Sequence, residues 1–240
     1  MRPVEKGSTP QGNNFSDYRD FYPDLHSRIG SYCSYCERRI PTNLAIEHIQ
    51  PKSLSKYQHL VNDWNNFILA CVNCNSTKGN QDVQLADYLL PDRDNTAHAY
   101  EYLEDGVIKV AENLGNENHA MAVNTLELTG LDKPNDQIHN SNGEFVYVDR
   151  VGQRMEARLI AIESKQDLLI NDSDGFRIQV VKTALGYGFF SIWMNVFKDD
   201  KDMRIRFIKA FPGTSEECYD NDTKTISPRL SNHLPDSGKV

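Results

Sequence analysis

The chain has 240 residues, of which 26 are basic and 34 are acidic, giving a formal net charge of −8. It has no apolar run of membrane-spanning length and no apolar opening typical of a secretory signal, so we expect a cytoplasmic protein. Residues 1–80 hold 9 basic and 7 acidic side chains, whereas residues 81–240 hold 17 and 27. The first part is therefore able to face phosphate, and the second suits a protein partner or ordinary solubility better than a nucleic acid.

The first 29 residues predict a polar arm followed by one helix. Residues 1–14 are polar and include Gly7, Pro10 and Gly12, which favours an arm. Apolar and aromatic residues then recur at near-helical spacing over residues 16–29. Pro23 lies within that pattern and is expected to break or kink the helix.

Residues 30–90 predict a compact core built from two strands and a helix. Residues 44–49 suit a short strand, and residues 67–70 suit a second strand or a turn. A helix is expected after Asn75 and should carry Lys78 onward. This strand–strand–helix order places the polar residues discussed below close together.

Residues 91–214 predict a mainly helical accessory region, and residues 215–240 predict a loosely ordered tail rich in Asp, Ser, Asn and Pro. The run 132–143 is expected to be a loop or surface insertion. The other expected elements are a hairpin turning at Asp105-Gly106, a helix over 118–128 closed by Gly130, a long amphipathic helix over 151–169 and a buried helix over 189–197. The fold class that follows is α+β, with a small core in a mostly helical chain.

Four of the five cysteines form two Cys-x-x-Cys pairs, which are typical of a structural zinc site. Cys33 and Cys36 are separated from Cys71 and Cys74 by thirty-four residues. Each pair supplies two thiolates from one tight turn, and four thiolates close a tetrahedral shell that leaves no position for substrate or water. We therefore predict that Zn²⁺ stabilises the core without taking part in chemistry, and that Cys218 is a free thiol.

A candidate site lies between and beside the cysteine pairs, where Glu47-His48, Asn66 and Asn75 occur. A neutral imidazole takes a proton from water near neutral pH, so His48 is the candidate general base. Carboxylate and amide oxygens ligate hard cations, and amides also fix loops. His59 is the second candidate for the base.

The segment 30–80 resembles the HNH endonucleases with the ββα-metal active site, in the form that carries a four-cysteine zinc. The shared features are the paired cysteines, an acid-His-x-x-Pro motif, an asparagine five residues before the third cysteine, and a Cys-x-x-Cys-Asn-x-x-Lys-Gly motif. The resemblance implies that His48 is the general base and that Asn66 holds the loop presenting it. It also implies that Glu47 and Asn75 hold a catalytic Mg²⁺ or Mn²⁺. Since Glu and Asn stand where the family often has Asp and His, an oxygen-binding metal is favoured.

A weaker resemblance extends to the PtuB family, the HNH subunits of Septu-type antiphage systems, including retron-linked versions. It rests on Met1-Arg2-Pro3-Val4, the residues around Cys33, Phe190-Ser-Ile-Trp193 and Phe211-Pro-Gly-Thr214. The resemblance implies a partner, an SMC/ABC-like ATPase of the PtuA type that controls the nuclease. In retron-linked versions it also implies a reverse transcriptase and its msDNA, reached through the ATPase.

Three functions are compatible with these patterns. The first is a DNA endonuclease, in which Lys52, Lys56 and Lys78 are candidate phosphate contacts. The second is the same nuclease acting on RNA, such as tRNA. The third is a zinc-stabilised module that binds nucleic acid or protein without chemistry. The ordered set of Glu47, His48 and the two asparagines favours catalysis over the binding module.

Overall fold

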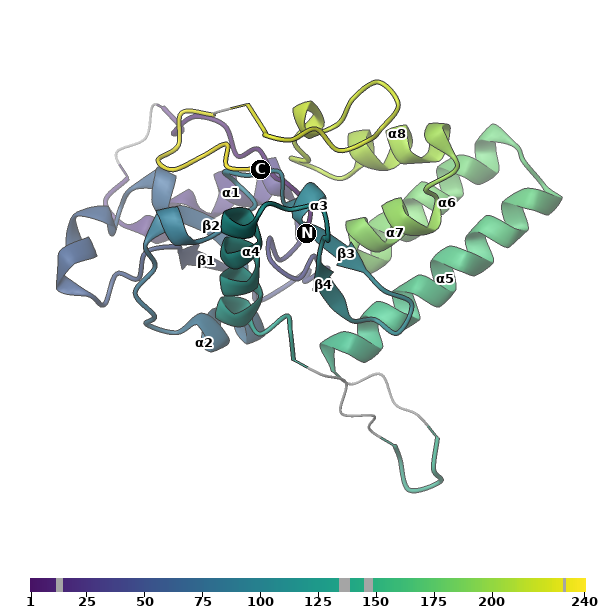
Figure 1. The fold of residues 1–240 in the computed structure, drawn as a ribbon, viewed down its shortest axis with the longest axis horizontal. Coiled ribbons are helices and arrows are strands. Elements are labelled where there is room, and N and C mark those ends of the chain that lie inside the picture. The colour runs from purple at the N-terminus through teal and green to yellow at the C-terminus, as the bar shows by residue number, and fades with distance from the viewer. Residues whose placement is uncertain (12–14, 134–138, 145–148, 231) are drawn as a thin grey trace.

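The computed structural model describes residues 1–240 apart from 12–14, 134–138, 145–148 and 231 (Figure 1). Its α-helices are α1 (Tyr22–Ile29), α2 (Val72–Lys78), α3 (Thr96–Ala99), α4 (Asn116–Thr129), α5 (Arg150–Ile170), α6 (Asp174–Tyr187), α7 (Phe190–Val196) and α8 (Lys201–Ala210). Its strands are β1 (Ala45–His48), β2 (Phe67–Ala70), β3 (Tyr100–Tyr102) and β4 (Ile108–Val110). Short 3₁₀ helices are η1 (Tyr18–Phe21), η2 (Ser55–Leu60), η3 (Trp64–Asn66), η4 (Leu85–Asp87) and η5 (Glu216–Cys218). The fold is α+β, as the sequence predicts.

The predicted strand–strand–helix unit is present. β1 pairs antiparallel with β2, so that His48 lies opposite Phe67. α2 follows β2 directly and ends at Lys78, because Gly79 has a φ of 53° that ends the helix. The prediction of a helix that begins after Asn75 and continues beyond Lys78 is therefore wrong. Asn75 lies within α2, and one face of this short helix packs against the end of β1 through Lys78.

The helices predicted from apolar periodicity are present with shifted ends. α4 ends at Gly130, which has a φ of 61°, and the Leu131 N–H donates back to the Leu126 carbonyl at 2.9 Å. α7 is buried along most of its length, with Trp193 fully enclosed. The helix expected over residues 16–29 is divided into η1 and α1, as the prediction of a break or kink at Pro23 requires. Pro23 lies in the first turn of α1, where no N–H partner is lost.

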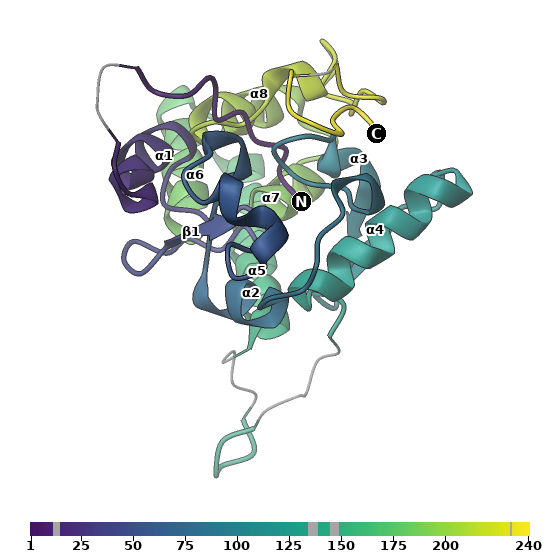
Figure 2. The same cartoon turned by 90° about the vertical axis from the view of Figure 1, so that its left-hand side faces the viewer.

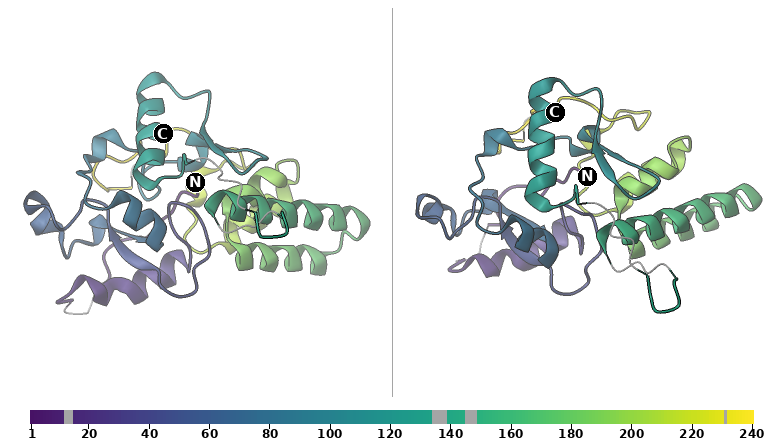
Figure 3. Two further views of the ribbon diagram at one scale, coloured as in Figure 1. Left: turned by 90° about the horizontal axis from the view of Figure 1, so that it is seen from below. Right: turned by 60° about the horizontal axis from the view of Figure 1, so that its bottom comes forward.

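Helices α5 to α8 form the accessory region on the side of the molecule away from β1 and β2. α5 packs against α6 and α7, and α8 packs against the same two helices. Figure 3 shows α5 and α6 projecting side by side from the body of the molecule. β3 and β4 pair antiparallel around the predicted turn at Asp105-Gly106, and α4 packs against α2 (Figure 2). Within the described residues, no helix is both long enough and apolar enough to cross a membrane.

The first residues of the chain are part of the core, so the predicted polar arm is wrong for residues 1–6, of which all but Glu5 are buried. Residues 7–11 are mostly exposed, as the prediction expects, and residues 12–14 of the predicted arm lie outside the described residues. Met1 and Val4 are each only 1% exposed. The Arg2 guanidinium donates to the Pro212 carbonyl at 2.6 Å and to Thr214 Oγ1 at 3.0 Å. Polar composition predicted exposure, but partners more than two hundred residues away satisfy these polar groups inside the protein.

The segment 215–240 is irregular but packed, in contrast to the expected loosely ordered tail. The Asn95 side chain donates to the Cys218 carbonyl at 2.8 Å. Arg229 is buried and pairs with Glu5 at 2.9 Å. Figure 1 shows this yellow segment passing close to the N-terminus. Side chains from residues 215–240 belong to the same apolar cluster as side chains from residues 1–29, 30–90 and 91–214. Residues 134–138 of the predicted insertion over 132–143 lie outside the described residues.

Candidate active site

The four paired cysteines form one buried cluster. Their sulfur atoms lie within 4.8 Å of one another. The distance from Cys36 Sγ to Cys71 Sγ is 3.7 Å, close to the roughly 3.8 Å edge of a tetrahedron with Zn–S bonds of about 2.3 Å. A disulfide would bring two sulfurs to about 2.05 Å. The donor set and its spacing therefore fit a structural zinc, which would be held by Cys33, Cys36, Cys71 and Cys74.

The cluster also ties the core to the accessory helices. Arg150, the first residue of α5, donates from Nη1 to Cys74 Sγ at 3.4 Å and to the Thr129 carbonyl at 2.8 Å. A guanidinium beside the sulfurs offsets the negative charge that four thiolates around Zn²⁺ carry. On the first knuckle, the Glu37 carboxylate accepts from the Ser191 N–H at 2.7 Å. Loss of the cluster would therefore disturb contacts on both sides of the molecule.

His48 lies at the end of β1, and one hydrogen bond determines which of its ring nitrogens carries the proton. Its Nε2 is 2.9 Å from the Val61 carbonyl, which only accepts hydrogen bonds, so Nε2 is the protonated nitrogen and Nδ1 carries the lone pair. The ring packs edge-on against Tyr18 and Phe67, with centroid distances of 4.8 and 5.1 Å. Burial lowers the pKa of His48 below its ordinary value. His48 is therefore neutral near pH 7, with one nitrogen available to accept a proton. His59 is exposed on η2 and does not line the cavity described below.

Asn66 bridges the loop that follows His48. Its Oδ1 accepts from the Gln50 N–H at 2.8 Å, and its Nδ2 donates to the Gln50 carbonyl at 2.9 Å. The Asn66 carbonyl also accepts from the Ile49 N–H at 3.0 Å. These three bonds fix the two residues immediately after His48 against the end of η3.

Glu47 and Lys78 form a buried ion pair beside His48. The side chains are 3% and 1% exposed, and Lys78 Nζ lies 2.6 Å from Glu47 Oε1. Lys78 Nζ also donates to the His48 carbonyl at 2.9 Å. Burial raises the pKa of Glu47, and the Lys78 charge opposes that shift. Lys78 therefore holds Glu47 and the end of β1 to α2. It is buried, and its predicted contact with phosphate stays a prediction.

Three of the four predicted catalytic residues, Glu47, His48 and Asn75, meet at one open cavity of about 280 Å³. The fourth, Asn66, does not line this cavity. Its lining residues are Tyr18, Ala45, Ile46, Glu47, His48, Pro51, Lys52, Ser53, Asn75, Lys78, Gly79 and Asn80. A carboxylate and an amide thus share the cavity with a neutral imidazole. One carboxylate oxygen of Glu47 is paired with Lys78, so the second oxygen and the Asn75 amide remain as a partial oxygen shell that fits Mg²⁺ or Mn²⁺.

The other two lysines differ in their placement. Lys52 lines the cavity, with Nζ 3.8 Å from the centroid of the Tyr18 ring. Lys56 is exposed, pairs with Asp82 at 2.5 Å and does not line the cavity, so the prediction of a phosphate contact there has no support. The sequence does not predict that Tyr18 lines the cavity, because this aromatic residue lies thirty positions before His48 and belongs to no motif. It also does not predict the hydrogen bond between His48 and the Val61 carbonyl, since every residue type has a backbone carbonyl.

Comparison with known families agrees with this geometry. A search of curated proteins gave no match. The family model described as HNH endonuclease matches residues 33–81. The match begins at the first cysteine of the cluster and includes His48, Asn66 and Asn75. Residues 33–81 therefore carry an HNH endonuclease domain built around a four-cysteine cluster, and nuclease activity is the activity that this family indicates.

Proposed function

We propose that this protein is a divalent-metal-dependent endonuclease that hydrolyses phosphodiester bonds of DNA, with His48 as the general base. One observation carries the proposal. His48, Glu47 and Asn75 line a single cavity within the HNH match, and the bond to the Val61 carbonyl leaves His48 Nδ1 as a proton acceptor. A binding module without chemistry has no use for a neutral imidazole held in this way.

In the proposed reaction, His48 Nδ1 takes a proton from the water that attacks phosphorus. The ring enters the reaction neutral and oriented, because Nε2 is bonded to Val61 and Asn66 fixes the following loop. Lys52 at the cavity offers a positive charge for a substrate phosphate. A divalent ion held by Glu47 and Asn75 would stabilise the negative charge that develops on the phosphate and on the leaving 3′ oxygen. RNA is the alternative polymer, and the roles of these residues are the same for both.

The ligand assignment is tested by metal titration of cleavage. Asn75→Ala and Glu47→Gln are each expected to raise the Mg²⁺ or Mn²⁺ concentration needed for half-maximal rate by about tenfold or more, because each removes a ligand oxygen or its charge. At position 47, Gln is chosen over Ala because the amide oxygen of Gln still accepts a hydrogen bond from Lys78. Removing one partner of a buried ion pair altogether costs about 3–5 kcal/mol and would confuse stability with metal binding.

Asn73→Ala is the matched control for Asn75→Ala. Asn73 is exposed on the same helix and does not line the cavity, so its removal should leave the metal dependence unchanged. Melting temperatures of all three variants are measured beside the titrations. Unchanged metal dependence in both Glu47→Gln and Asn75→Ala would refute the proposed ligand set.

We also propose a protein partner, on the resemblance to the PtuB family. The partner would be an SMC/ABC-like ATPase that controls this nuclease during antiphage defence, joined by a reverse transcriptase and msDNA in a retron-linked system. The acidic excess over residues 81–240 supports a protein contact there more than a nucleic-acid contact. Co-expression with an ATPase encoded beside this gene tests the proposal, and separate elution of two folded proteins contradicts it.

A further inference from the structure

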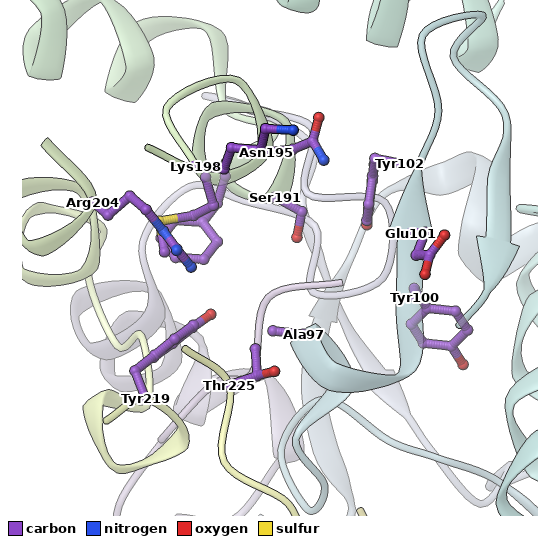
Figure 4. Close-up of a pocket in the computed structure, with 12 residues that line it drawn as sticks. Ala97, Tyr100, Glu101, Tyr102, Ser191, Asn195, Lys198, Arg204, Tyr219 and Thr225 are labelled. Atoms are coloured by element: carbon purple, nitrogen blue, oxygen red, sulfur yellow. The ribbon is translucent and has the colours of Figure 1, made fainter. Parts of the chain in front are cut away.

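A second cavity lies in the accessory region, between β3, α7, α8 and the C-terminal segment (Figure 4). It has a volume of about 200 Å³ and shares no lining residue with the cavity at His48. Binding sites for drug-sized ligands are usually about 300–1,000 Å³. This cavity is smaller, so it can enclose one end of a ligand of that size while the rest of the ligand lies at its mouth.

The cavity contains polar atoms that have no hydrogen-bond partner among the described residues. The Tyr219 side chain is 8% exposed, and its hydroxyl is buried without a hydrogen bond among the described residues. Arg204 Nε is buried and also has no partner among them, while Arg204 Nη2 donates to the Thr223 carbonyl at 2.5 Å. Figure 4 shows the Arg204 and Tyr219 side chains directed toward the same open space. Buried polar atoms without partners are costly, and a ligand that accepts hydrogen bonds would satisfy both.

The residues that line this space carry two positive charges, on Arg204 and Lys198, and one negative charge, on Glu101. Lys198 lines it together with Arg204, and neither forms an ion pair with a carboxylate in the part of the chain that the structure describes. The acidic residue of the lining, Glu101, lies on the β3 side, apart from Arg204 and Tyr219 in Figure 4. An anion therefore fits the cavity better than a neutral or positive ligand.

The remaining wall suits a planar group. Phe190 and Tyr219 meet edge to face, with ring centroids 6.4 Å apart, and Tyr102 and Met194 complete the apolar surface. The Tyr102 and Ser191 hydroxyls are already used, since both donate to Glu37 Oε1. Aromatic rings beside cationic donors are the combination that binds a nucleobase and its phosphate.

We propose that this cavity binds a phosphate monoester carried on a nucleoside, with Arg204, Lys198 and the Tyr219 hydroxyl holding the phosphate and the aromatic wall contacting the base. The ligand is either a free nucleoside monophosphate or the phosphorylated 5′ end of a nucleic-acid strand. Both present the same chemistry to these three side chains.

Isothermal titration calorimetry of the full-length protein in phosphate-free buffer tests the proposal. AMP and dAMP are expected to bind saturably, and adenosine and inorganic phosphate at least about tenfold more weakly. Tyr219→Phe and Lys198→Gln should each weaken binding of the monophosphates by about tenfold or more, the loss expected for a hydrogen bond to a charged group. Tyr219→Phe removes only a hydroxyl that has no partner in the described part of the chain, so the melting temperature should not fall. Lys209→Gln makes the same charge change at an exposed position of α8 outside the cavity and should bind as the wild type does.

A short oligonucleotide with and without a 5′-phosphate separates the two sources. Preference for the phosphorylated strand over AMP identifies a strand end, and the reverse preference identifies the free nucleotide. His48→Ala should bind either ligand like the wild type, which keeps this result independent of nuclease activity. The proposal is overturned if neither phosphorylated ligand binds, if adenosine binds as tightly as AMP, or if Tyr219→Phe and Lys198→Gln both retain wild-type affinity.

Discussion

His48→Ala is expected to slow phosphodiester cleavage by about a hundredfold to ten-thousandfold, the usual contribution of a positioned general base. Alanine removes the Nδ1 acceptor together with the ring contacts to Tyr18 and Phe67. The Lys78 bond to the His48 carbonyl remains, because any residue at position 48 provides that carbonyl. The melting temperature of the variant is therefore measured beside its rate. Single-turnover cleavage with saturating Mg²⁺ measures the loss.

The pH dependence of cleavage is a second test of His48 as the general base. The base acts only when it is neutral, and burial lowers the pKa of His48, so the wild-type rate should rise with pH through an apparent pKa below about 6.5. His48→Ala should lose that inflection. His59→Ala, which changes an exposed histidine outside the cavity, should keep both the rate and the inflection. Equal rates for His48→Ala and the wild type would exclude His48 as the base.

Cys71→Ser is expected to cost the protein its zinc and most of its stability. Structural zinc contributes an apparent 10–16 kcal/mol or so in small domains, comparable with the total stability of about 5–15 kcal/mol of a typical protein. Cys71 also precedes α2 directly, so its loss releases the helix that carries Asn75 and Lys78. Metal analysis should find about one zinc per wild-type chain and far less in the variant. Thermal denaturation should show a large fall in melting temperature.

Cys218→Ala is the control for this experiment, because Cys218 is a buried free thiol outside the cluster. It should retain zinc and lose only the modest stability that a truncated core side chain costs. A Cys71→Ser protein that keeps both its metal content and its melting temperature would show that the cluster does not stabilise the core.

The local parts of the fold could be predicted because their signals are local. The spacing of the two Cys-x-x-Cys pairs is enough to predict a four-cysteine metal site. Gly130 closes α4 because the helix end needs a residue in the left-handed conformation. The residues around Glu47 and His48 were located by a short ordered motif, and the structure brings them to one cavity.

The parts that failed depend on contacts between distant segments. Residues 1–14 and 215–240 have the composition of exposed chain, yet Arg2 bonds to Pro212, and Arg229 pairs with Glu5. Polar composition does not reveal that such partners will be found inside the fold. The burial of Lys78 against Glu47 could not be predicted for the same reason, since it follows from how α2 packs beside β1 and not from the sequence around Lys78.

The chemistry of the cut ends tests the proposed hydrolysis most directly. Purified protein is incubated with end-labelled DNA and RNA in Mg²⁺ or Mn²⁺, with and without EDTA at a concentration that spares thiolate-bound zinc. Water activated by His48 leaves 5′-phosphate and 3′-hydroxyl ends on either polymer, so we expect these ends and complete inhibition by EDTA. Cleavage that continues in EDTA and leaves 2′,3′-cyclic phosphate ends would contradict a metal-dependent hydrolysis at this site.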